Sequence, residues 1–373
     1  MNTQPLSGFV RELDGYVELR QQENRNTSVT LLNGDLVSNS KQETGGLSAR
    51  VYHQGCWGFA SHPEVNQSAI SKVIKLAGDN ARVLSRRTSD PGVVLPPSIY
   101  TGEFDFTTKQ PILSPQQRIE FVRTLDAYIE QHYTKLKSRT VLLRTEDMQK
   151  MFTSSGGSEG YSMIPRSVIY IFLTAENTDG EPVEVFEPIA RRGQFEDCFD
   201  DPASFFPVID QLVEHLMNKT QAVVANAGFK EVVMSGELAG MLAHEAVGHT
   251  TEADLVRGGS VAGDLLEQQV ASPLVSMVDF AHSYEGKLLQ VPVHIDDEGV
   301  EARDAVLIEQ GILKGFMHNR ESSAYYEKPL TGNARAFKFS DEPLIRMRNT
   351  AVLPGTDKLE EMISSIEDGY YLM

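Results

Sequence analysis

The sequence is poor in cysteine, in basic residues and in long apolar runs, and each shortage excludes a class of protein. Two cysteines, Cys56 and Cys198, among 373 residues allow at most one disulfide, so no disulfide framework stabilises the chain. Lysine and arginine number 34 against 52 aspartate and glutamate, and the net charge of −18 opposes direct binding to nucleic-acid phosphates. The longest apolar run, residues 168–173, is far too short to span a membrane. Because no signal-peptide pattern is visible at the start, we expect a cytoplasmic protein.

The order of strand and helix patterns predicts an α+β fold. Apolar and polar side chains alternate over residues 15–20, 27–32 and 46–53, and Asn33-Gly34 is a hairpin signal. Further strands are expected at residues 141–144, 149–154 and 167–174, and helices at 63–86, 114–137 and 202–225. Ser114 and Gln117 have the spacing of a capping box at the start of the second helix. Strands and helices do not alternate regularly, which argues against a parallel sheet.

Proline and glycine between residues 88 and 113 indicate a linker, which suggests a division of the chain into three parts. We expect an N-terminal strand–helix segment at residues 1–87 and a central α+β segment at 112–225. A C-terminal mixed α/β domain at 229–373 follows, and it carries the residues with the clearest chemistry. These are placed on a helix that we expect to begin after Ser235 and to reach about residue 249.

The motif His244-Glu245-Ala246-Val247-Gly248-His249 combines two imidazoles with a carboxylate. Neutral imidazoles bind Zn²⁺, and a neighbouring carboxylate can take a proton from a zinc-activated water. In the common H-E-x-x-H motif the histidines share one helix face, whereas here they are one residue further apart and would lie about 140° apart on a regular α-helix. Both can hold one metal only if the helix bulges or ends between them, and Gly248 is the residue expected to tolerate that distortion. Alternatively, both histidines are ordinary helix residues.

The residues around this motif resemble the TldD/PmbA family, specifically its TldD-type metalloprotease branch. The resemblance extends over nearly the whole chain in ordered blocks: residues 33–34, 55–60, 236–249 with Glu252 and Asp254, 296–299 with Arg303, 308–311, 331–335 and 346–350. It implies a zinc-dependent peptidase active on peptides or unfolded segments. Carried over to this chain, it makes His244 and His249 metal ligands and Glu245 the general base.

The same resemblance implies a partner. Members of this branch pair with a non-catalytic homologue, TldE or PmbA, and have been labelled modulators of DNA gyrase. Because this chain keeps both histidines and the glutamate, it resembles the catalytic partner, and we expect a homodimer or a heterodimer with a TldE/PmbA-like homologue. At a net charge of −18 with no basic stripe, we expect any effect on gyrase to be indirect.

The chain departs from the family at its C-terminal end. Family members run on well beyond the block at residues 346–350, and their third metal ligand, commonly a cysteine, falls in that later part. We therefore expect a truncated chain, with zinc lost or completed by water, Glu252 or Asp254. The alternative function is a non-catalytic binding or assembly subunit whose metal site is disabled.

Other polar residues have plainer interpretations. Cys56 is expected to be a buried small hydrophobe, and acidic neighbours should make Cys198 a poor nucleophile. His282, His294 and His318 are candidate third ligands on residue type alone. The carboxylates of residues 296–298 are expected in a solvated turn closed by Gly299, with a hard-cation site as the alternative. Arg335, Arg346 and Arg348 either grip a peptide carboxylate or form structural ion pairs.

Overall fold

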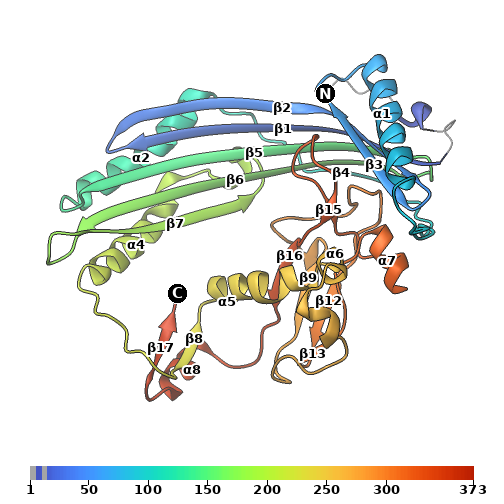
Figure 1. Cartoon of the computed structure of the whole chain (residues 1–373). Helices are drawn as coiled ribbons and strands as arrows, with labels where there is room; N and C mark the ends of the chain where they lie inside the picture. The colour runs from blue at the N-terminus through green and yellow to red at the C-terminus, as the bar shows by residue number, and fades with distance from the viewer. Residues whose placement is uncertain (1–5, 11–14) are drawn as a thin grey trace.

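The computed structural model describes residues 6–10 and 15–373, and its mixture of helices and strands confirms the α+β class. A long twisted sheet dominates the N-terminal half (Figure 1). Its strands are β1 (Tyr16–Leu32), β2 (Asp35–His53), β3 (Cys56–His62), β4 (Thr101–Asp105), β5 (Ser138–Ser154), β6 (Glu159–Glu176) and β7 (Pro182–Arg192). The order is β3-β2-β1-β5-β6-β4, with β7 pairing with the other part of β6. The segments expected at 1–87 and 112–225 thus both contribute strands to one sheet.

The hairpin between β1 and β2 turns where the sequence predicts it. Asn33 and Gly34 have φ values of 50° and 90°, and two successive positive values are the signature of the type I′ turn that suits a twisted hairpin. All of the pairs among β1, β2, β3, β5, β6 and β7 are antiparallel, and only β4 runs parallel to its neighbour β6. The prediction against a parallel sheet is therefore confirmed.

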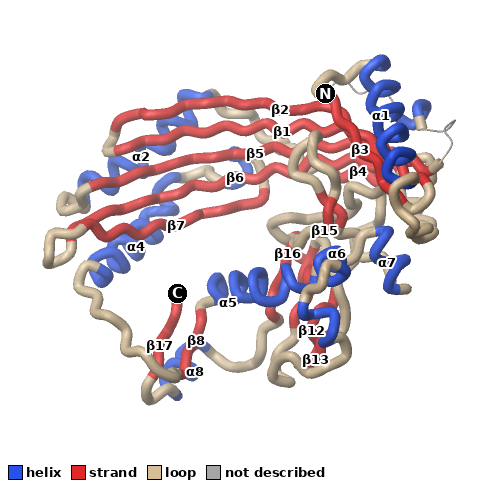
Figure 2. The backbone as a smooth tube through the Cα atoms, viewed as in Figure 1, coloured by secondary structure: helices blue, strands red, loops and turns tan. Residues whose placement is uncertain are grey.

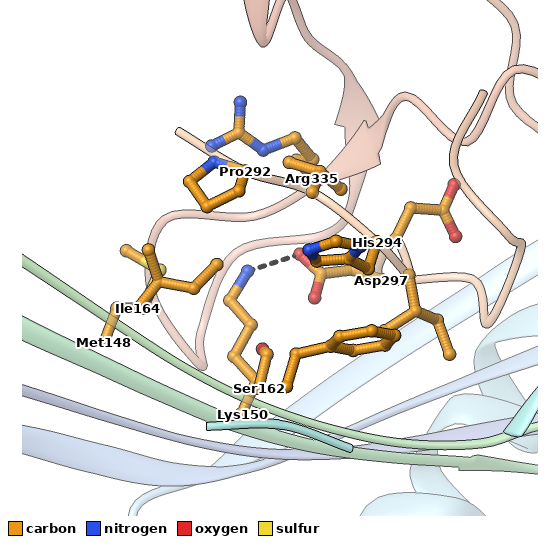
Figure 3. Close-up of a pocket in the computed structure, with 12 residues that line it drawn as sticks. Met148, Lys150, Ser162, Ile164, Pro292, His294, Asp297 and Arg335 are labelled. Carbon is orange, nitrogen blue, oxygen red and sulfur yellow. Dashed lines mark hydrogen bonds and ion pairs between the residues drawn. The ribbon is translucent and has the colours of Figure 1, made fainter. Parts of the chain in front are cut away.

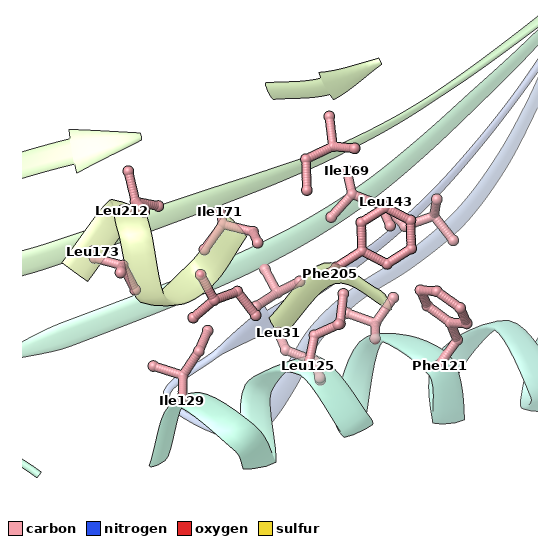
Figure 4. Packing of buried hydrophobic residues seen from close by; sticks show 14 of the residues in the cluster. Leu31, Phe121, Leu125, Ile129, Leu143, Ile169, Ile171, Leu173, Phe205 and Leu212 are labelled. Carbon is pink, nitrogen blue, oxygen red and sulfur yellow. The ribbon is translucent and has the colours of Figure 1, made fainter. Parts of the chain in front are cut away.

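Helices cover one face of this sheet along its length. They include α1 (Gln67–Ser85), α2 (Pro115–His132), α3 (Phe195–Cys198) and α4 (Phe206–Lys219), with the 3₁₀ turns η1 (Leu6–Phe9) and η2 (Pro202–Phe205) beside them. Val141, Ile169 and Ile171 alternate along β5 and β6 and pack against α2 and α4 in a fully apolar cluster (Figure 4). A second apolar cluster joins α1 to β1 and β2. The capping box of Ser114 and Gln117 is present at the start of α2, as expected.

The C-terminal part is less regular and lies against one end of the sheet's other face (Figures 1 and 2). Its helical segments are α5 (Gly236–Leu242), η3 (Ala243–Gly248), η4 (His249–Thr251), α6 (Ala253–Arg257), η5 (Val261–Leu265), α7 (Arg320–Tyr326) and α8 (Leu359–Ser365). Its strands are β8 (Glu231–Met234), β9 (Met277–Phe280), β10 (Ser283–Tyr284), β11 (Lys287–Leu288), β12 (Ala305–Glu309), β13 (Ile312–Leu313), β14 (Ala334–Arg335), β15 (Leu344–Ile345), β16 (Asn349–Val352) and β17 (Gly369–Leu372). A four-stranded sheet, β13-β12-β9-β16, carries its apolar core.

The last residues of the chain form a strand. β17 runs parallel to β8, and the two make a small sheet that lies apart from the larger one in Figure 1. Within the described residues, no helix is long and apolar enough to cross a membrane.

Charged side chains fill the contact between the large sheet and the C-terminal part. Asp297 lies 3.3 Å from an Arg20 nitrogen and 2.6 Å from Lys150 Nζ, and Arg50 pairs with both Glu18 and Glu298. The expectation of a solvated turn at residues 296–298 is wrong: each of the three acidic side chains is at most 6% exposed. The turn is closed by Gly299 with φ of 72°, but it inserts into the interface, where cations of the sheet pair with Asp297 and Glu298.

Candidate metal centre

The helix that carries the motif changes its winding at the motif itself. Ser235 caps α5, and its hydroxyl accepts a hydrogen bond from the Leu238 N–H, as expected. From Ala243 to Gly248 the chain is a π-helix, and the His249 N–H donates to the His244 carbonyl five residues earlier. A π-helix has more residues per turn than an α-helix, so five residues make about one full turn. His244 and His249 therefore lie on the same side of the helix. Of the two possibilities that their spacing allows for a shared metal, a bulge or a helix end, the structure shows the bulge.

The two histidines and Glu245 form the group of donors best suited to a metal in the described part of the chain. One donor atom from each lies within 4.8 Å of the others, and the two imidazole rings stand 4.8 Å apart at 86°. Tetrahedral zinc places ligand nitrogens about 3.3 Å apart, as bonds of about 2.0–2.1 Å require. All three side chains are exposed and can rotate to close that difference. The residues present therefore fit a zinc ion in donor type and approximate spacing.

Gly248 has a different role from the one expected. Its φ of −53° is ordinary for any residue, so the bulge does not depend on the conformational freedom of glycine. A Cβ at this position would lie 2.0 Å from the sulfur of Met347. The glycine thus allows the π-helix to pack closely on the segment that leads into β16.

Glu252 contacts the ring of His249 at its nitrogen Nδ1. Its Oε1 lies 3.1 Å from His249 Nδ1, and its Oε2 accepts a hydrogen bond of 3.2 Å from Arg346. The side chain of Glu252 is only 1% exposed, and burial raises its pKa while Arg346 opposes that shift. A carboxylate on Nδ1 fixes the ring and leaves Nε2 for a metal. Sequence reasoning considered Glu252 only as a ligand; its position three residues after His249 was the available signal.

The other candidate ligands lie outside this cluster. His318 is buried beside the Ser322 hydroxyl, while His282 and His294 stack on each other at 4.3 Å. Asp254 is not part of the group either. Burial first, and Asp197 second, raise the pKa of Cys198 to about 11, which confirms that it is a poor nucleophile. Cys56 is half-buried, less enclosed than expected.

Arg346 and Arg348 form ion pairs, whereas Arg335 forms none with the described residues. Arg348 and Asp279 form an ion pair at 2.8 Å in which both side chains are 0% exposed, and this pair is structural. Arg346 pairs with Glu252 and is half exposed. Arg335 donates to the Met347 carbonyl at 2.7 Å and forms no ion pair with any described residue.

Comparison with known proteins gives consistent results. The model of the PmbA/TldA metallopeptidase C-terminal domain matches residues 228–373, and that of PmbA/TldA metallopeptidase domain 1 matches residues 17–81. A zinc metalloprotease TldD homologue of Saccharolobus solfataricus is 30% identical over 334 residues, which cover 88% of this chain and 70% of the relative. A metalloprotease of Methanocaldococcus jannaschii is 29% identical over 367 residues, 97% of this chain and 78% of the relative.

Solved structures show the same fold. A proposed modulator of a DNA gyrase from Thermotoga maritima superimposes with a TM-score of 0.78 at 20% identity, over 95% of this chain and 78% of the other. TldE from Thermococcus kodakarensis gives a TM-score of 0.70 at 19% identity, over 98% and 79%. At such identities the likeness concerns architecture alone.

Proposed function

Because the chain belongs to the PmbA/TldD family and is a metallopeptidase, we propose that it is a zinc peptidase in which His244 and His249 hold the metal and Glu245 is the general base. The observation that carries this assignment is the π-helical turn, which brings two histidines five residues apart to one side of the helix beside a carboxylate. One relative is named a zinc metalloprotease, which supports zinc as the metal.

Each residue of the site has its own role in hydrolysis. When bound, zinc lowers the pKa of water to about 7 and polarises a peptide carbonyl. Glu245 takes a proton from the attacking water and later gives it to the leaving amine. Glu252 keeps the His249 ring in place through Nδ1, and Arg346 holds the Glu252 carboxylate on its other oxygen.

We propose peptides or unfolded segments as substrates, held by strand addition. β8 pairs only with β17 among the described strands, and its last residue precedes the helix cap Ser235. An extended peptide that pairs with the other edge of β8 would therefore lie close to the start of the helix that carries the histidines. Folded proteins rarely present such a strand. Equal cleavage of a folded protein and its unfolded form would contradict this substrate class.

We also propose that the chain acts as the catalytic subunit beside a TldE-like homologue. The fold shared with TldE supports a pairing of similar chains. Copurification of a tagged chain with a homologue that lacks the histidine motif would test it, and a chain that cleaves peptides fully as a monomer would contradict an obligatory partner.

The deciding experiment compares Glu245→Gln with wild type in the presence of zinc. The substitution keeps the shape of the side chain and removes the base, so we expect peptide cleavage to fall at least a hundredfold with zinc still bound. Glu237→Gln is the matched control, because Glu237 is an exposed glutamate in the first turn of the same helix and outside the cluster. Unchanged cleavage by Glu245→Gln would refute the assignment. A wild type without zinc and without activity would favour the non-catalytic subunit.

A further inference from the structure

A small cavity lies between the sheet and the C-terminal part (Figure 3). The sheet contributes Met148, Lys150, Ser162 and Ile164, and the C-terminal part contributes Pro292, His294, Asp297 and Arg335. Its volume of about 40 Å³ is room for about three water-sized groups, since one water needs about 10–15 Å³. The cavity is thus large enough for a carboxylate and too small for a whole side chain of ordinary size.

Lys150, Arg335, Asp296 and Asp297 line this cavity, and Arg20 lies beside it on Asp297, although the whole chain is strongly acidic. Lys150 and Arg20 share the single carboxylate of Asp297, and Arg335 adds a third cation. Burial, with Glu298 next, raises the pKa of Asp296 and so favours its uncharged form. Burial lowers the pKa of Lys150 to about 8, and Arg20 and Arg335 push it in the same direction, while Asp297 opposes them. An anion in the cavity would relieve this repulsion between cations.

Arg335 is the cation with unused hydrogen-bonding capacity. A guanidinium has five N–H groups, and the structure shows one hydrogen bond from Arg335, to the Met347 carbonyl. Arg346 and Arg348 each have a carboxylate partner, whereas Arg335 has none among residues 6–10 and 15–373. Its side chain is partly exposed, so a ligand from solvent can reach it.

We propose that this cavity is a carboxylate-binding subsite in which Arg335 receives the carboxylate of a peptide. A planar guanidinium matches a carboxylate through paired N–H groups, which a neutral amide cannot replace. Apolar side chains of Met148, Ile164 and Pro292 line the same cavity and exclude water from the pair.

The subsite is linked to the metal centre through one residue. Met347 accepts the Arg335 hydrogen bond at its carbonyl and packs against Gly248 with its sulfur. Arg335 is therefore connected by two contacts to the π-helix that carries the histidines. The statement that this peptide is the substrate rests on the proposed function; the binding itself does not.

The test measures binding of three small peptides to the zinc-free full chain, because a carboxylate also binds zinc directly. The probes are N-acetyl-Ala-Ala with a free carboxylate, the same peptide as a carboxamide, and N-acetyl-Asp-Ala-carboxamide, which carries its carboxylate on a side chain. We expect at least one of the two carboxylates to bind at least tenfold more tightly than the neutral carboxamide. The preferred arm shows whether the site takes a main-chain or a side-chain carboxylate.

Variants assign the binding to Arg335. Arg335→Gln should reduce the affinity for the carboxylate to that for the carboxamide, and Arg335→Lys should keep part of the difference. Arg303→Gln removes one charge from the same part of the protein, where Arg303 pairs with Glu301 at the surface, and should change nothing. Equal binding of all three peptides by wild type, or full carboxylate affinity in Arg335→Gln, would overturn the proposal. Loss of peptide cleavage plays no part in this readout, so a failure of the peptidase assignment would be seen separately.

Discussion

The two faces of the large sheet are buried in opposite ways. On the helix-covered face, Leu143, Ile169 and Ile171 are at most 1% exposed and pack in a large cluster of buried apolar side chains. On the other face, Glu18, Arg20 and Arg50 are at most 4% exposed; Arg20 and Arg50 pair with the charged turn at residues 296–298, and Glu18 pairs with Arg50. The first face stabilises the N-terminal half by itself. On the second face, the C-terminal part supplies the carboxylates of Asp297 and Glu298 to Arg20, Lys150 and Arg50, which couples the metal-bearing part to the sheet.

The largest expected effect on stability comes from removing one cation from the charged face. Arg50→Met leaves Glu18 and Glu298 buried next to each other without their common cation, and we expect a loss of about 3–5 kcal/mol in the free energy of unfolding. Urea denaturation followed by tryptophan fluorescence measures it, because Arg50 lies 3.9 Å from the ring of Trp57, the single tryptophan.

The triple variant Glu18→Gln/Arg50→Met/Glu298→Gln sharpens this test. With both carboxylates neutralised, much of the loss should be recovered, since the cost comes from unpaired charge rather than from lost volume. An equally unstable triple variant would show that shape, not charge, dominates the interface.

On the apolar face, the matched prediction is a cavity. Ile171→Ala removes a fully buried side chain from the cluster between β6 and the helices, and we expect a loss of about 3 kcal/mol. Unfolding followed by circular dichroism measures the loss. Zinc content should not change, because the cluster does not touch the metal centre, and a zinc-free variant would contradict the separate roles of the two faces.

At the metal centre, the partner of His249 can be removed without touching a ligand. Glu252→Gln keeps the size of the side chain but loses the carboxylate on Nδ1, and we expect zinc affinity to fall by about ten- to a hundredfold. Competition with a chelator measures it. Asp254→Asn is the control, since Asp254 is two residues away and outside the cluster. Equal effects of the two substitutions would contradict a specific role for Glu252.

The smallest expected change, taken per pH unit, is a dependence of stability on pH at the charged face. Burial lowers the pKa of Lys150 from 10.5 to about 8, so between these values the unfolded chain binds a proton that the native protein does not. Stability should therefore rise with pH across that window, with a slope of up to about 1.4 kcal/mol per pH unit. Denaturation midpoints between pH 8 and 10 measure the slope, and Lys150→Met should reduce it. An identical slope in the variant would contradict the assignment to Lys150.

The burial of the apolar face could be predicted from the sequence and the burial of the charged face could not, for a physical reason. The alternation around Ile169, the capping box at Ser114 and the turn at Asn33-Gly34 are local signals, and the structure confirms them. Partners of the charged turn lie far away in sequence: 147 residues separate Lys150 from Asp297. When those partners are not known, an acidic turn is predicted to be exposed to solvent.

At the metal centre, too, the local feature could be predicted from the sequence and the long-range contacts could not. The distance of five residues between His244 and His249 predicted that the helix bulges or ends between them if both hold one metal, and the structure shows a π-helical bulge. The contact of Glu252 with Arg346, 94 residues later, depends on how β15 and β16 are placed and left no local trace. Close packing of Gly248 on Met347 was equally invisible, and conformational freedom was the wrong reason for that glycine.

The most direct test of the account is the zinc content of the purified chain. We predict about one zinc per wild-type chain, measured by mass spectrometry of the metal, and none in the double variant His244→Ala/His249→Ala. Circular dichroism should show that the variant keeps its fold, because both side chains are exposed. Negligible zinc in the wild type, or equal zinc in wild type and variant, would contradict a metal centre at these two histidines.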